Sequence, residues 1–171
     1  HTGRLVQQLM LLGRLAAEGR GDIDRAPADL REIARDVCGL FAEAALEQHV
    51  DLELQLPPAP VTVVAQSELL AEALANLIDN ALKAAGRKGQ VLVAVIESPP
   101  GLRVCDNGPG IKPSERAAIF EPYARGSRPR WEGTGLGLAI VRDVAALHGA
   151  RVSVSDGELG GACFAFEFPR G

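Results

Sequence analysis

Residues 72–83 read Glu-Ala-Leu-Ala-Asn-Leu-Ile-Asp-Asn-Ala-Leu-Lys, inside a helix that the pattern predicts over residues 67–85. The polar side chains share a sector about 100° wide, and leucines and alanines fill the opposite arc. This sector contains Glu72, Asn76, Asp79, Asn80 and Lys83. A solvated face is the ordinary explanation, but solvated faces favour Glu and Lys, and Asn is a poor helix former. Two asparagines one turn apart, followed by a lysine, offer carbonyl oxygens for a hard cation and an ammonium group for phosphate.

A second informative stretch follows a predicted strand and reads Asp106-Asn107-Gly108-Pro109-Gly110-Ile111. Two glycines and a proline can form a turn and nothing more. A carboxylate at the end of a strand can also accept a hydrogen bond from an exocyclic amine. The glycines would then let a flat ligand approach the backbone.

The third stretch, Gly133-Thr134-Gly135-Leu136-Gly137-Leu138, opens a helix predicted over residues 135–148. Exposed backbone N–H groups and the positive end of the helix dipole make such a start an anion site. The stretch is neither a P-loop nor a dinucleotide fingerprint, because no Lys-Ser/Thr pair follows it and no strand leads tightly into it.

Composition excludes several classes of protein. The chain has 171 residues, of which 47% are apolar, so it is long enough for one domain with a core. A net charge of −4 and an aromatic content of 4% argue against nucleic-acid binding. Cys38, Cys105 and Cys163 are far apart, so the sequence predicts no disulfide framework and no zinc site, and a reduced, cytosolic setting.

The first helix is predicted over residues 4–18, with Leu5, Leu9, Leu12 and Ala16 on one stripe that Val6 and Leu15 widen. It either packs on its own domain or is the tail of a coiled-coil or bundle helix. Because the chain starts inside this helical pattern, we expect it to be part of a longer protein. A linker is predicted over residues 20–27.

The remaining elements mix strands and helices without a strict βαβ alternation. Helices are predicted over 28–48, 67–85, 114–120 and 135–148, and strands over 50–56, 61–65, 90–96, 102–105, 151–155 and 162–168. The order indicates an α/β (α+β) fold, a two-layer sandwich with a mixed sheet.

Together, and in this order, the stretches resemble the sequence boxes of sensor histidine kinases. Residues 72–83 resemble the N box and residues 106–111 the G1 box, while 119–125 (Ile-Phe-Glu-Pro-Tyr-Ala-Arg) resemble the F box and 133–141 the G2 box. The resemblance covers residues 24–171 and implies a Bergerat ATP-binding fold with about three helices. Residues 1–19 resemble the end of the second helix of the dimerisation and phosphotransfer domain. The implied organisation is a helix stub (1–19), a linker (20–27) and a catalytic domain (28–171).

The resemblance also implies roles for residues. The catalytic set would be Asn76, Asn80, Lys83 and Arg125. In this set Asn80 would coordinate Mg²⁺, and the side chains of Lys83 and Arg125 would contact phosphate. Asp106 would accept from the adenine amine. The other residues implied to bind ATP are Gly108, Gly110, Ile111, Phe120, Thr134, Gly135, Leu136, Gly137 and Leu138. Residues 125–134 would form a lid.

Some positions depart from the family pattern or from its relatives. Several ATPases of the same fold place a catalytic Glu where this chain has Asn76, and an amide cannot take a proton near pH 7, so hydrolysis is disfavoured. Ala84 stands where the family often has an aromatic residue. The acceptor histidine is missing, because His1, His49 and His148 all lack its context, and we expect structural roles for the last two.

The implied function is transfer of the ATP γ-phosphoryl group to a histidine on a separate dimerisation domain, by positioning and charge neutralisation. The implied partners are that domain and the receiver domain of a response regulator, with no nucleic acid. The whole protein would be a homodimer anchored in a membrane outside this cytoplasmic segment. The alternatives are a non-catalytic nucleotide-binding module and a serine kinase of the anti-sigma type.

Overall fold

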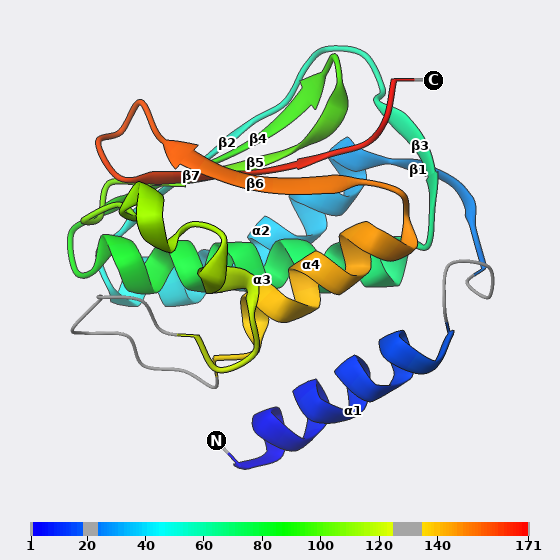
Figure 1. Cartoon of the computed structure of the whole chain (residues 1–171). Helices are drawn as coiled ribbons and strands as arrows, with labels where there is room; N and C mark the ends of the chain where they lie inside the picture. Colours follow the sequence, from blue (N-terminus) through cyan, green and yellow to red (C-terminus); the bar gives the residue numbers. More distant parts are fainter. Residues whose placement is uncertain (1, 19–23, 125–134, 171) are drawn as a thin grey trace.

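The computed structural model describes residues 2–18, 24–124 and 135–170 and has two layers (Figure 1). One layer is a mixed sheet in the order β2-β4-β5-β7-β6. Its strands are β2 (Asp51–Gln55), β4 (Gln90–Glu97), β5 (Pro100–Asp106), β7 (Ala162–Glu167) and β6 (Arg151–Asp156). The other layer consists of the helices α2 (Leu30–Glu47), α3 (Ser67–Ala85) and α4 (Gly137–Leu147). The predicted two-layer sandwich with a mixed sheet is confirmed.

The sheet topology follows from the connections between its strands. β2 and β4 are parallel, and α3 lies between them in the chain, as a crossover requires. β4 and β5 form the predicted hairpin, and β6 and β7 close the sheet with a second antiparallel pair. The end of β5 at Asp106 therefore lies at the same end of the sheet as the start of β4, with Asp106 opposite Val91.

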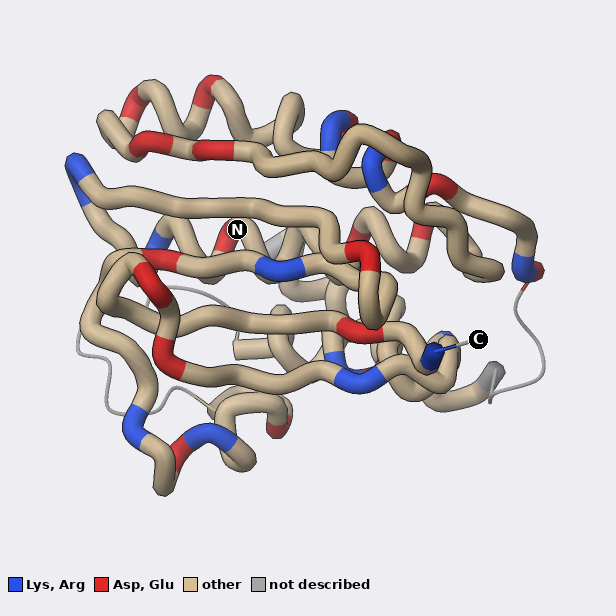
Figure 2. The backbone as a smooth tube through the Cα atoms, turned by 90° about the horizontal axis from the view of Figure 1, so that it is seen from above, with Lys and Arg blue, Asp and Glu red and all other residues tan. Residues whose placement is uncertain are grey.

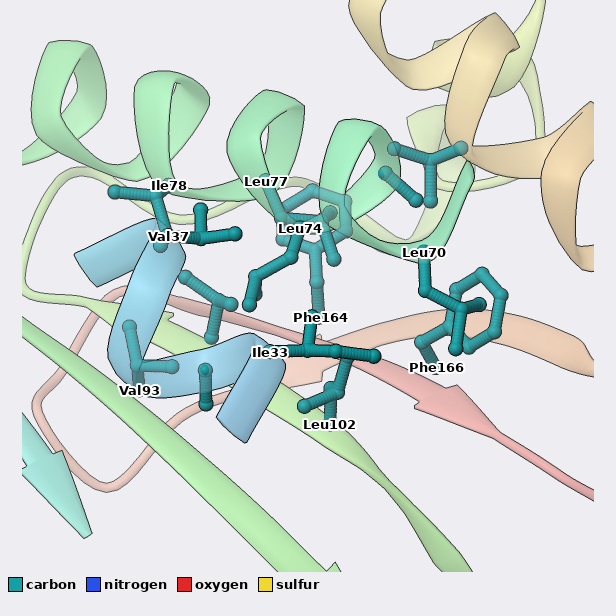
Figure 3. Packing of buried hydrophobic residues seen from close by; sticks show 14 of the residues in the cluster. Ile33, Val37, Leu70, Leu74, Leu77, Ile78, Val93, Leu102, Phe164 and Phe166 are labelled. Atoms are coloured by element: carbon teal, nitrogen blue, oxygen red, sulfur yellow. The ribbon is translucent and has the colours of Figure 1, made fainter. Parts of the chain in front are cut away.

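The helix α3 is the centre of the core. Its residues Leu70, Leu74, Leu77 and Ile78 are fully buried and face side chains of the sheet and of α2 (Figure 3). The sheet contributes Val93, Leu102, Phe164 and Phe166, and α2 contributes Ile33 and Val37. Burying side chains of this size stabilises the domain by roughly 1.5–3 kcal/mol each relative to exposure. One arc of α3 is thereby fixed against the sheet, and this sets the direction of its polar sector.

The segment before α2 differs from the prediction. Residues Ala26–Asp29 form a strand, β1, which pairs with β3 (Thr62–Ala65), so the predicted linker ends earlier than residue 27. The helix starts at Leu30 instead of residue 28, because Asp29 caps it by accepting from Arg31 N at 3.0 Å and also accepts from Val61 N at 3.2 Å. The side-chain hydrogen bond from Arg31 lowers the pKa of Asp29.

Two other predicted elements are shorter than expected. The helix predicted over 114–120 consists of two 3₁₀ turns, Pro113–Glu115 and Ala118–Phe120. The helix predicted from residue 135 begins at Gly137 instead. Gly135 has a φ of +75°, which is incompatible with a right-handed α-helix.

The first helix, α1 (Thr2–Glu18), lies on the far side of the helical layer from the sheet and packs on α4 (Figure 1). Its buried face contains Gln8 and Leu15, whereas Leu9 is exposed, so the predicted stripe was wrong in part. The pattern of α1 contains overlapping apolar stripes, and the surface offered by its neighbours decides which stripe is covered. Packing on its own domain is the arrangement observed.

The cysteines also differ from the prediction. Cys105 and Cys163 lie directly opposite each other on β5 and β7 and are joined by a disulfide. The two cysteines are 58 positions apart in the sequence, and nothing in the intervening stretch signals their pairing, which depends on strand register. Burial raises the pKa of the Cys38 thiol to about 11, as expected for a core residue.

Seen from above, the strands of the sheet have acidic and basic residues interspersed along them (Figure 2). Arg103 on β5 is exposed there, and at one end of β6 Arg116 pairs with Asp156 at 2.8 Å. None of the described helices is both long and apolar enough to cross a bilayer.

His148 joins the end of α4 to the start of α3. Its Nε2 accepts from Gln66 N at 3.1 Å, so Nδ1 carries the proton and donates to the Val144 carbonyl at 2.8 Å. Burial lowers the pKa of His148, the hydrogen bond to Val144 opposes this shift, and the charge of Arg25 adds to it. The neutral imidazole is therefore the form that the fold requires, which fits a structural role.

We predict that stability falls as the pH drops below about 6.5. The native pKa of His148 is lower than its unfolded value, so its contribution is complete above the unfolded pKa and is lost as the pH falls through the native one. His148→Phe should cost about 1 kcal/mol at pH 7.5 and weaken this pH dependence. Thermal unfolding between pH 5 and 8 measures both effects, with His49→Asn at an exposed turn as the control. An unchanged pH profile in His148→Phe contradicts the assignment.

Candidate functional site

The polar sector of α3 is not a solvated face. Asn76 and Asn80 are only 6% and 5% exposed, because α4 packs along this side of α3. Both polar atoms of the Asn80 side chain, Oδ1 and Nδ2, are buried and have no hydrogen-bond partner among the described residues. An unsatisfied buried amide costs about 1–3 kcal/mol, so the arrangement points to a ligand that satisfies it.

Asp106 ends β5 as a fully buried carboxylate. Its Oδ1 accepts from Gly108 N at 2.8 Å and from Ala162 N at 3.4 Å, and these backbone bonds fix the carboxylate in place. A Cβ on Gly161 would lie 2.4 Å from Asp106 Oδ1, so only glycine allows β7 to start beside this carboxylate. The site is thus a rigid acceptor held by two turns.

The turn after Asp106 packs directly on the end of α3. A Cβ on Gly108 would lie 2.4 Å from the Ala84 carbonyl oxygen, so glycine is required for this approach. Asn76, Asn80 and Ala84 follow one another at successive turns of α3. Asn80 therefore lies between the Asp106 turn at one end and the residues that contact Asn76 at the other.

Gly137, the first residue of α4, lies against the Asn76 side chain. A Cβ on Gly137 would lie 2.9 Å from Asn76 Oδ1. The cap residue of α4, Leu136, provides no side-chain hydrogen bond to the first turn, and this turn contains no acidic residue. Backbone N–H groups at such a helix start bind anions. The segment 135–138 thus places the N-terminal end of α4, a candidate anion site, beside Asn76.

A contact between Tyr123 and Gly135 joins the segment after Phe120 to the segment that leads into α4. Tyr123 N donates to the Gly135 carbonyl at 2.7 Å, and a Cβ on Gly135 would lie 2.8 Å from Tyr123 Cα. Both residues have a positive φ, 64° for Tyr123 and 75° for Gly135. The predicted F and G2 boxes are therefore adjacent in the structure.

Apolar side chains from the same turns line the region. Ile111 and Leu138 are buried, and Phe120 is half-buried with its ring 6.1 Å from that of Phe164 in an edge-to-face contact. Gly110, with a φ of +75°, turns the chain between Asp106 and Ile111. This composition suits a flat apolar ring with a polar edge, because apolar walls and a few fixed polar groups are typical of ligand sites.

Lys83 Nζ lies 2.9 Å from Asp79 Oδ2, one turn earlier on α3. The pair is partly exposed, so its contribution to stability is small, about 0.3–0.5 kcal/mol. Lys83 is therefore held near Asn80 and can exchange Asp79 for an anionic ligand at little cost.

The described residues contain no group of three or more His, Cys, Asp or Glu that could hold a metal ion. Mg²⁺ is often held by one or two protein oxygens together with ligand phosphates and waters. Asn80 Oδ1, to which no described residue donates a hydrogen bond, fits that use. Arg125, Thr134 and the expected lid over residues 125–134 lie outside the described residues, as does His1.

Two contributors were missed by the sequence reasoning. Gly161 contacts Asp106, and Tyr123 contacts Gly135. The Gly160-Gly161 pair before β7 was the available signal for the first, because paired glycines mark a close backbone approach. No signal identified the backbone of Tyr123.

A groove of about 1020 Å³ lies on the other side of Asn76. It is lined by Met10 and Leu11 of α1, Phe41 of α2, and Glu72 and Asn76 of α3, among other residues. It does not include Asp106, so the groove and the Asp106 region meet only at Asn76. The candidate ligand-binding groups are those around Asp106, Asn80 and the start of α4, outside this groove.

Comparison with known proteins identifies the fold. Residues 65–171 match the family described as histidine kinase-, DNA gyrase B-, and HSP90-like ATPase. The chain is 39% identical over 158 residues to the probable sensor histidine kinase TcrY of Mycobacterium tuberculosis, covering 89% of this chain and 32% of that protein. The chain spans 19% to 37% of the length of the curated relatives it matches.

Two solved structures are similar as well. The mycobacterial sensor histidine kinase MprB has 30% identity and a TM-score of 0.74, with 84% of this chain and 97% of that chain covered. Full-length ShkA in complex with AMPPNP has 32% identity and a TM-score of 0.78, with 98% and 36% covered. The match extends over most of the sheet and the helices around Asn80, and the chain belongs to the histidine kinase-, DNA gyrase B-, and HSP90-like ATPase family, as a catalytic ATP-binding domain of the sensor histidine kinase type.

Proposed function

We propose that this domain binds Mg²⁺ and ATP between α3, the Asp106 turn and the start of α4, and transfers the γ-phosphoryl group to a histidine on another domain. The observation that carries the proposal is Asn80, a buried amide that has no hydrogen-bond partner in the part of the chain that the structure describes. It lies between the Asp106 carboxylate and the N-terminal end of α4. The complex of the relative ShkA with AMPPNP supports a nucleotide at this fold.

Asp106 would read the base. Its buried carboxylate can accept from the exocyclic amine of adenine, while Gly108 and Gly110 leave room for the ring. Ile111, Phe120 and Leu138 would provide apolar contacts to the nucleotide. A hydrogen bond to a charged acceptor contributes about 1.5–3 kcal/mol, enough to orient the base.

The phosphates would extend along α3 toward Asn76. Asn80 Oδ1 would hold Mg²⁺, which neutralises charge on the phosphate oxygens. Backbone N–H groups of Gly135 and Gly137 and the ammonium of Lys83 would bind the same oxygens. Arg125 and Thr134 complete the proposed set from the segment 125–134. Positioning and charge neutralisation are the main sources of catalysis in phosphoryl transfer.

The residue at Asn76 favours a kinase over a hydrolase. Its amide cannot accept a proton from water, so bound ATP would be hydrolysed slowly. The acceptor would be a histidine of a dimerisation and phosphotransfer domain, of which α1 would be the C-terminal stub, residues 20–27 a linker and residues 28–171 the catalytic domain. The phosphoryl group would pass on to the receiver domain of a response regulator. The whole protein would be a membrane-anchored homodimer with this domain in the cytoplasm.

We predict that Asn80→Ala abolishes the effect of Mg²⁺ on nucleotide affinity without destabilising the fold. The substitution removes the proposed metal ligand, but it also removes a buried amide without a hydrogen-bond partner in residues 2–18, 24–124 and 135–170, so the unfolding temperature should stay the same or rise. Calorimetric titration with AMPPNP, with and without Mg²⁺, measures the first effect. Asn107→Ala is the control, since Asn107 Oδ1 accepts from Gln90 N at 2.8 Å and its loss should lower the unfolding temperature. A full Mg²⁺ effect in Asn80→Ala contradicts the proposal.

We also predict that the 171-residue chain alone does not label itself with γ-labelled ATP. His148 uses both ring nitrogens inside the fold, and His49 lies in an exposed turn after α2. A separate dimerisation domain added in trans should become labelled slowly, because no tether raises its effective concentration at the catalytic domain. Acid-labile label on the added domain supports a histidine acceptor. An acid-stable label on it favours a serine kinase, and label on the chain alone contradicts the assignment of the acceptor.

A further inference from the structure

Gln8 is a polar residue on the buried face of α1. It is only 9% exposed, whereas its neighbour Gln7 is exposed at the edge of the same groove. Gln8 Nε2 lies within hydrogen-bond distance of Asn76 Oδ1, at 3.4 Å. A buried amide on a packed helix face needs polar partners, so this contact helps to fix where α1 sits.

The Asn76 amide has little freedom to rotate. Its Nδ2 donates to the Glu72 carbonyl at 2.9 Å, and this bond directs Oδ1 toward Gln8 and Gly137. Turning the amide around would place Nδ2 against the Gln8 donor and break the bond to Glu72. While α1 is packed in place, Oδ1 of Asn76 therefore accepts from α1.

The same oxygen lies against the first residue of α4. A Cβ on Gly137 would approach it to 2.9 Å, so the anion-binding end of α4 and the Gln8 contact meet at one atom. The groove of about 1020 Å³ between α1, α2 and α3 reaches Asn76 from the other side. Asn76 is thus the junction between the packed helix α1 and the phosphate end of the site.

We propose that Gln8 is a positioning residue that opposes nucleotide binding, because packed α1 withholds Asn76 Oδ1 from the phosphate end of the site. This rests on the proposed function. Release of α1 frees the oxygen to act as an acceptor or metal ligand beside Asn80. Packing of α1 and binding of the Mg²⁺ nucleotide complex then exclude each other in part.

Two equilibria that oppose each other are linked reciprocally. If packed α1 lowers nucleotide affinity by some factor, then the nucleotide must loosen the packing of α1 by the same factor. A single neutral hydrogen bond corresponds to a factor of about two to ten. The linkage makes the proposal measurable from either side.

The test compares Gln8→Met with Gln7→Met in the 171-residue chain. Met keeps the length of the side chain but has no N–H donor, and Gln7 provides a matched position without the Asn76 contact. Calorimetric titration with Mg²⁺ and AMPPNP should give about two- to tenfold tighter binding for Gln8→Met and no change for Gln7→Met. Equal or weaker binding by Gln8→Met overturns the proposal.

Two further measurements distinguish positioning from a general effect on the fold. In an Asn76→Ala background, Gln8→Met should no longer change the affinity, since Gln8 acts through Asn76. Hydrogen exchange of α1 should speed up when Mg²⁺ and AMPPNP bind to the unsubstituted chain, because a released helix of 17 residues is marginal in water. A persisting Gln8 effect, or unchanged exchange, overturns the proposal. A chain that binds no nucleotide in any form contradicts the proposed function instead.

Discussion

The structure depends on the burial of the polar face of α3, although the described residues do not satisfy all of its hydrogen-bonding groups. One arc of α3 packs its leucines on the sheet, and the opposite sector is covered by α4 and α1, so Asn76 and Asn80 are removed from water. Asn76 finds partners in Glu72 and Gln8, whereas Asn80 finds none among the described residues. A fold that tolerates such an amide gives up stability for a binding site.

Glycine makes the rest of the site possible. At Gly108, Gly137 and Gly161, a side chain would collide with Ala84, Asn76 and Asp106 respectively. These approaches bring a turn, a helix start and a strand start within contact of α3 or of the carboxylate. At these three glycines the backbone therefore packs closely on the Ala84 backbone and on the side chains of Asn76 and Asp106.

Much of this could be predicted from the sequence because its main signals are local. The polar sector of α3 and the glycine pattern around Asp106 and Gly137 are each visible within one short stretch of sequence. Contacts set by tertiary packing were not predictable. The Cys105–Cys163 disulfide depends on strand register, and the buried face of α1 depends on what α4 offers. The strand at residues 26–29 was missed because a strand of four residues has almost no pattern of its own, and its residues were divided between the predicted linker (20–27) and the predicted helix (28–48).

The central claim is that Asp106 recognises a base with an exocyclic amine at one end of a site organised by α3. The most direct measurement is the affinity of the chain for ATP and for GTP, each with Mg²⁺, by calorimetry. Guanine would place a carbonyl opposite the buried carboxylate, so two acceptors would face each other without a proton between them. We expect ATP to bind at least about a hundredfold more tightly than GTP. Equal affinities for the two nucleotides would contradict it.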